Sequence, residues 1–246
     1  TLLADGMAWA EDPSNRDDRF ARTAVRRRLQ GADVAGIARG AARVGRVRAL
    51  LETEQAAWLA RHARLYRAGY VTLDAVALAA AADEIRLRVL AREAQTVAGA
   101  DYAPAVAGVE RLWTSLAAGR GATLGGAHFV PAEKTLGVYR EARNLPAVVP
   151  LSPSLTRWDR RFDVQVGEFP SGARLRPWTP ALGRAWPRRQ RPDWIQRLPD
   201  AARTGLPVVE NGGVLSAPEP GGAELVGVSV RFRSKMPLAG GGFNVA

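Results

Sequence analysis

Apolar residues recur at three- and four-residue steps through the first half of the chain, which is the pattern of helices with one buried face. This pattern predicts a helix over residues 33–67, a second long helix over residues 73–97 and a third helix that begins near Pro104. Gly69 suits the left-handed position that often ends a helix, and Asp74 has a side chain suited to cap the next one. In the first helix one apolar set repeats along a single face and is expected to pack: Val34, Ile37, Ala41, Val44, Val47, Leu50 and Leu51.

After residue 121 apolar and polar residues alternate instead, which is typical of half-buried strands. Residues 122–142 predict two short strands that are joined by a turn at residues 131–134. The remaining elements expected are strands within 157–166 and 172–178, a loop with a short helix at 179–199, a hairpin at 206–218 and a final strand within 224–233.

These elements predict an α+β fold, in which a helical region is followed by a smaller region rich in strands. The segment PAVVPLSPS is rich in proline and serine and is the best candidate for a domain boundary. We therefore expect an N-terminal unit at residues 1–30, a helical connector domain with a β-hairpin at 31–150, and a basic mixed domain at 151–246.

Composition excludes several classes of chemistry. The chain has 246 residues, of which 47% are hydrophobic, so it can bury a core, and it contains no cysteine for disulfides, thiolate catalysis or metal binding. Its two histidines, His62 and His128, are too few to suggest a metal site and are expected at surface or packing positions. No apolar run approaches the roughly 20 residues that span a bilayer. With no recognisable signal peptide, a cytoplasmic location is expected.

The net charge of +11 is the strongest compositional signal. A genome rich in G and C would also favour arginine over lysine, but the excess of positive charge itself favours nucleic acid as a partner. Residues 157–203 hold eleven arginines and five acidic residues. Trp158, Trp178, Trp186 and Trp194 are interleaved with them, as in surfaces that stack on bases. Packing in a core is the competing explanation, which we favour for Trp158 and hold equal for Trp186 and Trp194.

Residues 9–28 read WAEDPSNRDDRFARTAVRRR and form a charged segment near the start of the sequence. The DPSN stretch suits a turn, and Asp17 or Asp18 can cap a helix that starts near Arg19. Acidic residues at the front of that helix and arginines toward its end agree with the helix dipole. A solvated helix without a function would satisfy the same pattern.

The order of residues in this segment resembles the end of the catalytic domain of bacterial tRNA(Ile)-lysidine synthetases. The matching positions are Asp12, Pro13, Asn15, Phe20, Arg22 and Arg26. Thr23 stands where the family usually has asparagine. Three later segments resemble the same family: GATLGGAHFVPAEKTLGVYREARNLP with its Arg-Glu-x-Arg signature at 140–143, RWDRRF at 157–162 and LPVVENGGVLSAP at 206–218.

The resemblance implies an ATP-dependent ligase. Members of the family use ATP to activate the wobble cytidine of an isoleucine tRNA with a CAU anticodon, and pyrophosphate is released. The amine of lysine then displaces AMP to form lysidine. ATP and Mg²⁺ are the implied cofactors of the full-length enzyme, and they need a Ser-Gly-Gly-x-Asp-Ser loop after a strand. None of the Gly-Gly pairs at 125–126, 212–213, 221–222 and 240–242 has that context. We therefore expect this chain to be the C-terminal, tRNA-recognising part of a longer enzyme, to bind no cofactor and to be inactive alone.

The resemblance and the charge together indicate which residues could form functional sites. Arg22 and Arg26 are expected near the catalytic cleft, although a structural ion pair with Glu11 or Asp12 is equally compatible with the sequence. The arginines expected to bind tRNA are Arg140, Arg143, Arg160, Arg161, Arg188, Arg189 and Arg191. Lysine and ATP are expected to reach the tRNA through the missing domain, no membrane contact is expected, and a homodimer is left open. The alternative function is a standalone, non-catalytic, arginine-rich RNA-binding module, with an unrelated structural protein more distant.

Overall fold

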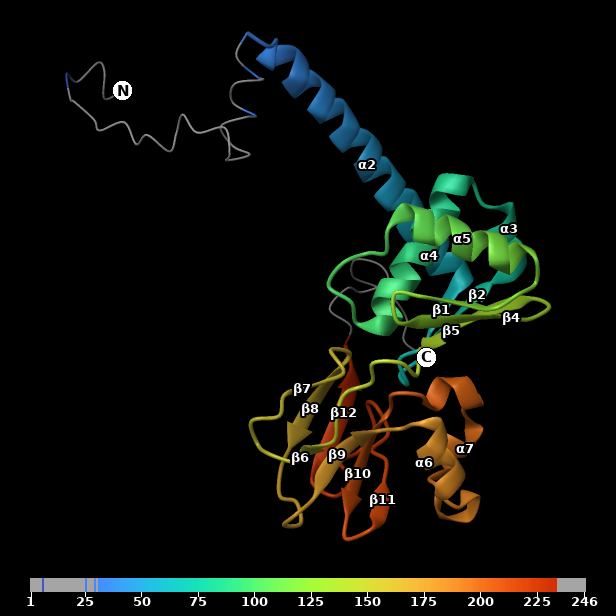
Figure 1. The fold of residues 1–246 in the computed structure, drawn as a ribbon, viewed down its shortest axis with the longest axis vertical. Coiled ribbons are helices and arrows are strands. Elements are labelled where there is room, and N and C mark those ends of the chain that lie inside the picture. Colours follow the sequence, from blue (N-terminus) through green and yellow to red (C-terminus); the bar gives the residue numbers. More distant parts are fainter. Residues whose placement is uncertain (1–5, 7–24, 26–28, 30, 234–246) are drawn as a thin grey trace. The chain divides into compact units, whose positions relative to one another are not determined.

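The residues that the computed structural model describes are Gly6, Val25, Leu29 and 31–233. The chain forms two compact units, Thr1–Leu51 and Glu52–Ala246. The predicted α+β class is confirmed, because helices dominate the first part of the described chain and antiparallel strands dominate the rest (Figure 1). None of the described helices is long and apolar enough to cross a membrane.

Helix α2 (Val34–His62) confirms the first predicted helix but ends before residue 67. The face that was expected to pack is exposed instead. Its large apolar residues Val34, Ile37, Val44, Val47 and Leu50 are 51–69% exposed. Periodicity shows which residues share a face, but it does not show whether another element covers that face. Near its end the helix meets a core, where Trp58 and Leu59 are buried.

After α2 the chain turns back as a hairpin. Strand β1 (Ala63–Leu65) pairs antiparallel with strand β2 (Val71–Asp74). Gly69 lies in the turn between them with φ +80°, and its amide donates a hydrogen bond to the carbonyl of Tyr66 at 2.8 Å. The prediction that Gly69 ends a helix is therefore wrong, because the left-handed conformation that glycine allows is used in a turn between strands.

The long helix predicted over residues 73–97 is interrupted. Its beginning is the end of β2, and its remainder is split into α3 (Ala75–Ala80) and α4 (Asp83–Ala98). The expected cap is confirmed, since Oδ1 of Asp74 accepts a hydrogen bond from the amide of Ala77 at 2.9 Å. The cap begins a helix of only six residues.

Arg86 stabilises the break between α3 and α4. Its guanidinium donates hydrogen bonds of 2.6–3.2 Å to three carbonyls at the end of α3, those of Leu78, Ala79 and Ala81. The same group forms an ion pair with Asp83 at 3.0 Å and lies 4.3 Å from the ring centroid of Trp113. Arg86 thus supplies donors to carbonyls at a helix end, where intrahelical amide donors run out. Apolar periodicity carries no signal for this interaction.

Helix α5 (Val106–Ala117) confirms the third predicted helix. The following strands are β3 (Ala122–Leu124), β4 (Ala127–Pro131) and β5 (Thr135–Arg140). They complete an antiparallel sheet of order β1-β2-β5-β4-β3, and α4 and α5 pack on it (Figure 1). The turn predicted at 131–134 is confirmed, but alternation over 122–142 did not separate β3 from β4, which a tight turn at Gly125–Gly126 joins.

Two smaller antiparallel sheets follow, of order β11-β10-β9-β6 and β12-β8-β7. Their strands are β6 (Val149–Pro150), β7 (Arg157–Trp158), β8 (Phe162–Val166), β9 (Arg174–Pro177), β10 (Pro207–Asn211), β11 (Val214–Ser216) and β12 (Val228–Phe232). Short helices lie between β9 and β10: α6 (Pro180–Ala185), η2 (Arg188–Gln190), α7 (Asp193–Arg197) and η3 (Asp200–Arg203). All the elements predicted after residue 155 are confirmed.

The second hydrophobic core lies among these sheets and short helices. Trp158, Trp178 and Trp186 are 2–3% exposed within it, so core packing explains their presence among the arginines. Trp194 is half-buried, and its Nε1 donates a hydrogen bond to the carbonyl of Ala217 at 3.2 Å. The three buried rings are therefore not available to stack on bases.

Glu93 is an exception to the apolar interior of α4. Its side chain is fully buried, and neither carboxyl oxygen has a hydrogen-bond partner among the described residues. Burial raises the pKa of this carboxyl well above its ordinary value, and the charge of Arg92 opposes the rise only in part. The folded state therefore favours the protonated form of Glu93.

We expect Glu93 to make the protein less stable as pH rises. The pKa of Glu93 is higher in the folded state than in the unfolded state. Its contribution to the free energy of unfolding is therefore complete below the unfolded-state pKa of about 4.3 and is lost as pH rises through the folded-state pKa. Urea unfolding at pH 5 and at pH 8 measures this effect. Between these two pH values, the free energy of unfolding should fall less in Glu93→Gln than in the unaltered chain. The difference should be about 1.4 kcal/mol for each unit of pKa titrated in that range.

The matched control is Glu133→Gln, which removes a carboxylate from an exposed turn. This variant should keep the pH dependence of the unaltered chain. Equal pH dependence of Glu93→Gln and the unaltered chain would show that Glu93 is ionised in the folded state.

Candidate nucleic-acid interface

The arginines predicted from the sequence fall into three groups. Arg22 and Arg26 lie outside the described residues. Arg140 and Arg161 are buried, with 5% and 1% of their surface exposed. The others are exposed or half-buried: Arg143, Arg160, Arg188, Arg189 and Arg191.

Asp159 binds both buried arginines. Its Oδ2 accepts hydrogen bonds from Nε of Arg140 at 3.1 Å and from Nε of Arg161 at 2.8 Å. Its Oδ1 accepts a hydrogen bond from Nη2 of Arg140 at 3.2 Å. Asp159 and Arg160 have φ values of +46° and +55° in the turn between β7 and β8. Since one carboxylate serves two guanidinium groups, further acceptors must compensate the remaining positive charge.

Backbone carbonyls supply these acceptors. Arg140 donates hydrogen bonds of 3.0–3.4 Å to the carbonyls of Gly126, Glu141, Arg143 and Asn144. Arg161 donates to the carbonyls of Gly69 at 3.3 Å and Gly205 at 3.4 Å. Burial lowers the pKa of Arg161 to about 10, and the charge of Asp159 opposes this change. Arg161 is therefore still positively charged at neutral pH.

Arg140 and Arg161 therefore stabilise the fold and do not offer their guanidinium groups to a phosphate. The prediction that these two residues bind tRNA is not supported by their positions. The Arg-Glu-x-Arg pattern gave no indication of which arginine is buried, because burial depends on strands that are distant in the sequence. The exposed Arg143 and Arg160 remain proposed contacts.

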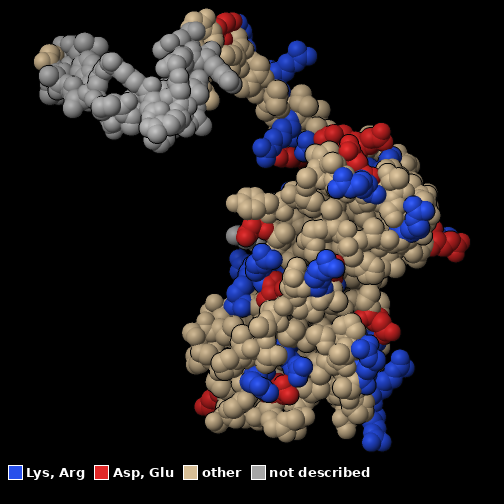
Figure 2. All heavy atoms as spheres, in the orientation of Figure 1, with Lys and Arg blue, Asp and Glu red and all other residues tan. Residues whose placement is uncertain are grey.

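A concave surface of about 500 Å³ lies among the short helices between β9 and β10. Its lining includes four arginines and a single acidic residue, Asp200, which gives a formal charge of +3. We call it the arginine pocket after Arg184, Arg188, Arg191 and Arg203. Figure 2 shows basic side chains gathered over the part of the molecule that carries α6 and α7.

Two arginines of the arginine pocket are held by the protein. Arg191 donates hydrogen bonds to the carbonyl of Trp186 at 2.9 Å and to the carbonyl of Gly183, at the end of α6. Arg203 donates to three backbone carbonyls at 2.8–3.3 Å and forms an ion pair with Asp200. Their positive charges are therefore fixed in place before any ligand binds.

The other two arginines are available to a ligand. Arg184 and Arg188 are exposed, and neither side chain forms a hydrogen bond or ion pair with another described residue. Partial burial lowers the pKa of Arg191, and the positive charges of Arg203 and Arg188 lower it further. Like charges thus converge here, and a bound anion would relieve their repulsion. Arg184 and Arg203 were not predicted from the sequence. Their position within the basic stretch 157–203 was the only feature that could have indicated them.

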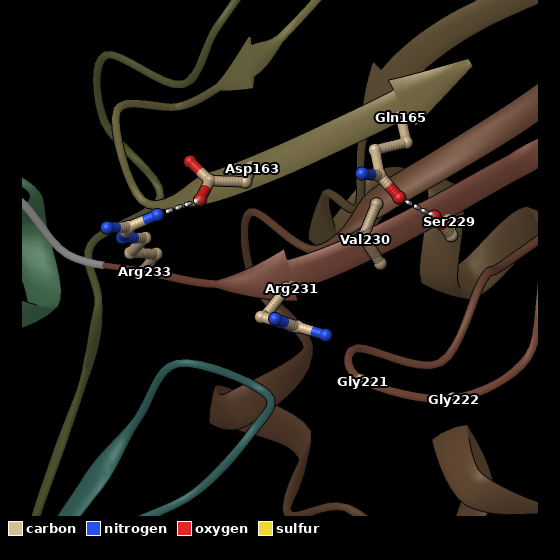
Figure 3. A pocket seen from close by; sticks show the side chains of 8 residues that line it. All are labelled: Asp163, Gln165, Gly221, Gly222, Ser229, Val230, Arg231 and Arg233. Atoms are coloured by element: carbon tan, nitrogen blue, oxygen red, sulfur yellow. Dashed lines mark hydrogen bonds and ion pairs between the residues drawn. The ribbon is translucent and has the colours of Figure 1, made fainter.

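A smaller concave surface of about 240 Å³ lies beside β8, β12 and the loop at Gly221–Gly222 (Figure 3). The side chain of Arg231 points toward this loop (Figure 3). That side chain forms no hydrogen bond or ion pair with another described residue. Asp163 forms ion pairs with Arg157 and, at 3.5 Å, with Arg233. Because Asp163 offsets these charges, this surface attracts anions less strongly than the arginine pocket.

Comparison with known proteins shows what the chain is similar to. No protein-family model matches the chain. A tRNA(Ile)-lysidine synthase of Ruegeria pomeroyi is 30% identical over 226 residues, which cover 88% of this chain and 51% of that protein. One of Rhizobium meliloti is 31% identical over 190 residues (76% and 40%), and one of Methylobacterium nodulans is 40% identical over 111 residues (43% and 33%). The chain is a relative of the tRNA(Ile)-lysidine synthases.

The resemblance predicted from the sequence motifs is thus confirmed. The chain spans between a third and about half of the length of these curated lysidine synthases. The similarity to the Ruegeria pomeroyi protein covers most of this chain, so it is not confined to one motif.

The described residues of this lysidine-synthase relative do not fit an ATP site. Gly125–Gly126 and Gly212–Gly213 lie in turns between paired strands, and Gly221–Gly222 lies in a turn before β12. None leads from a strand into a helix, the setting in which successive amides cradle phosphate groups. Within residues 31–233 no group of three His, Cys, Asp or Glu side chains could hold a metal ion.

We expect Asp159→Asn to lower the free energy of unfolding by about 3–5 kcal/mol, because two buried guanidinium groups would lose their carboxylate. Urea unfolding at neutral pH measures this loss. The matched control is Asp193→Asn, on the exposed start of α7, which should cost no more than about 1 kcal/mol. Equal losses for the two variants would show that the buried ion pairs do not stabilise the fold.

Proposed function

We propose that this chain is the tRNA-recognising part of a tRNA(Ile)-lysidine synthase. The whole protein joins lysine to the wobble cytidine of an isoleucine tRNA with a CAU anticodon, and ATP is converted to AMP and pyrophosphate. ATP, Mg²⁺ and lysine bind to a nucleotide-binding domain, and not to residues 31–233. The similarity to the Ruegeria pomeroyi synthase over 88% of this chain supports the proposal.

The observation that carries the proposal is the arginine pocket. A planar guanidinium group can donate two parallel hydrogen bonds to the oxygens of one phosphate. Arginine is therefore well suited to bind a phosphate backbone. Arg191 and Arg203 supply positive charge that is already in place, while Arg184 and Arg188 are free to bind a phosphate directly. An RNA backbone presents phosphates in succession, so it engages several of these charges at once.

Further arginines extend the proposed interface. Arg189 is exposed on η2 next to Arg188. Arg160 is 62% exposed, and its ion pair with Asp101 is long, at 4.0 Å. Such an exposed pair contributes little stability, so Arg160 can exchange this partner for a phosphate at small cost.

We expect the affinity for tRNA to fall steeply as salt concentration rises. Replacing Arg184, Arg188 and Arg189 together with glutamine should reduce the slope of log affinity against log salt by about 3, because each lost phosphate contact contributes about 1. Fluorescence anisotropy titrations between roughly 50 and 200 mM salt measure this slope. Arg191 is left intact, since it holds the end of α6.

The matched control removes the same charge from another surface. Arg111, Arg120 and Lys134 are exposed outside the arginine pocket, and their joint replacement by glutamine should leave the slope nearly unchanged. Equal reductions in both triple variants would mean that net charge alone governs binding. An unchanged slope in the pocket variant would remove the arginine pocket from the interface.

The 246-residue chain alone is expected to show no ATP–pyrophosphate exchange, because it contains no Ser-Gly-Gly-x-Asp-Ser loop. Exchange of labelled pyrophosphate into ATP is measured with isoleucine tRNA present, and a full-length tRNA(Ile)-lysidine synthase serves as the positive control. Exchange above background with this chain would contradict the assignment of ATP to another domain.

A further inference from the structure

A third concave surface joins three segments that are far apart in the sequence. It has a volume of about 290 Å³, and the lining residues that matter here are Tyr66, Arg67, Trp194, Arg197, Glu219 and Pro220. We call it the aromatic pocket. Pockets for small molecules usually begin at roughly 300 Å³, so this one is suited to a single base or nucleotide and not to a larger ligand.

The two aromatic side chains are held in position. The ring of Tyr66 stacks on the ring of Tyr70, with centroids 4.2 Å apart and planes 3° from parallel. The ring of Trp194 is anchored through the hydrogen bond from its Nε1 to the carbonyl of Ala217. Both residues are half-buried, so part of each remains accessible. A site with prearranged walls loses little conformational entropy when a ligand binds.

The backbone around Glu219 is also restricted. Pro218 and Pro220 flank it and are buried, and the Glu219 carbonyl accepts a hydrogen bond from the amide of Gly222 at 2.9 Å. Proline fixes one backbone torsion on each side of Glu219. The backbone of Glu219 is therefore restrained where its exposed side chain lines the aromatic pocket.

The charged residues of the aromatic pocket suit a nucleotide. Arg67 and Arg197 are exposed, and neither side chain forms a hydrogen bond or ion pair within the described part of the chain. Free guanidinium groups beside aromatic rings combine phosphate binding with base stacking. Glu219 is the one carboxylate among the lining residues, and a carboxylate accepts hydrogen bonds from amino groups of bases.

We propose that the aromatic pocket binds one unpaired nucleotide of RNA, with its base against Tyr66 and Trp194 and its phosphates at Arg67 and Arg197. Glu219 favours cytosine, adenine or guanine over uracil, because uracil has no amino group. This inference rests on the proposed function, since tRNA supplies the nucleotide. It adds a site for unpaired RNA that is separate from the arginine pocket, because the two share no lining residue.

The test measures binding of the full chain to short labelled oligo(C), oligo(U) and a blunt RNA duplex by fluorescence anisotropy. Tyr66→Leu should weaken binding of oligo(C) by about 5- to 150-fold, the range for losing one stacked base, and should leave duplex binding nearly unchanged. Glu219→Gln should reduce the preference for oligo(C) over oligo(U). Tyr102→Leu is the matched control, because Tyr102 is 87% exposed and outside the pocket.

A second variant guards against loss of folding in Tyr66→Leu. Joint replacement of Arg67 and Arg197 by glutamine changes exposed residues only, and it should also weaken oligo(C) binding more than duplex binding. If the unaltered chain binds tRNA but these variants bind oligo(C) as tightly as it does, the aromatic pocket is not a nucleotide site and the proposed function stands. If the unaltered chain binds neither tRNA nor oligonucleotides, both proposals are wrong.

Discussion

The carboxylate of Asp159 lies between two buried guanidinium groups, and several distant segments depend on that arrangement. Arg140 belongs to β5 of the first sheet, while Asp159 and Arg161 belong to the turn between β7 and β8. Burying two like charges is costly unless an opposite charge and oriented carbonyls compensate them. Glycine makes the necessary room: a Cβ at Gly205 would come within 2.7 Å of Nη2 of Arg161. The ion pairs thus join the sheet of the first core to the strands of the second.

This arrangement separates the arginines into two physical classes. Some are bonded to groups of the protein itself, as Arg86 is at the break between α3 and α4 and Arg161 is beside Asp159. Others, such as Arg184 and Arg188, have no partner within the described residues and keep their charge at the surface. Net charge therefore overstates the number of groups available to a nucleic acid, and position decides which ones are free.

The buried tryptophans serve the proposed interface indirectly. Trp178 and Trp186 pack in the second core with ring centroids 5.4 Å apart, and Trp178 also lines the arginine pocket. The carbonyl of Trp186 also anchors Arg191, whose guanidinium lies 5.5 Å from the centroid of Trp178. Core packing thus positions a charged surface, which is a different role from stacking on bases. The half-buried Trp194 is the exception, because its ring reaches the aromatic pocket.

The sequence alone predicted the α+β class, most elements after residue 100 and the relation to the lysidine synthases, because periodicity, turn residues and motif order can be read without knowing any tertiary contact. It did not determine that α2 leaves Val34 and Val44 exposed, nor that Arg86 divides the helix predicted over 73–97. The basic stretch indicated where cations are concentrated. The three-dimensional structure was needed to show that Arg161 is buried while Arg184 is free, because burial and pairing depend on contacts between residues far apart in the sequence.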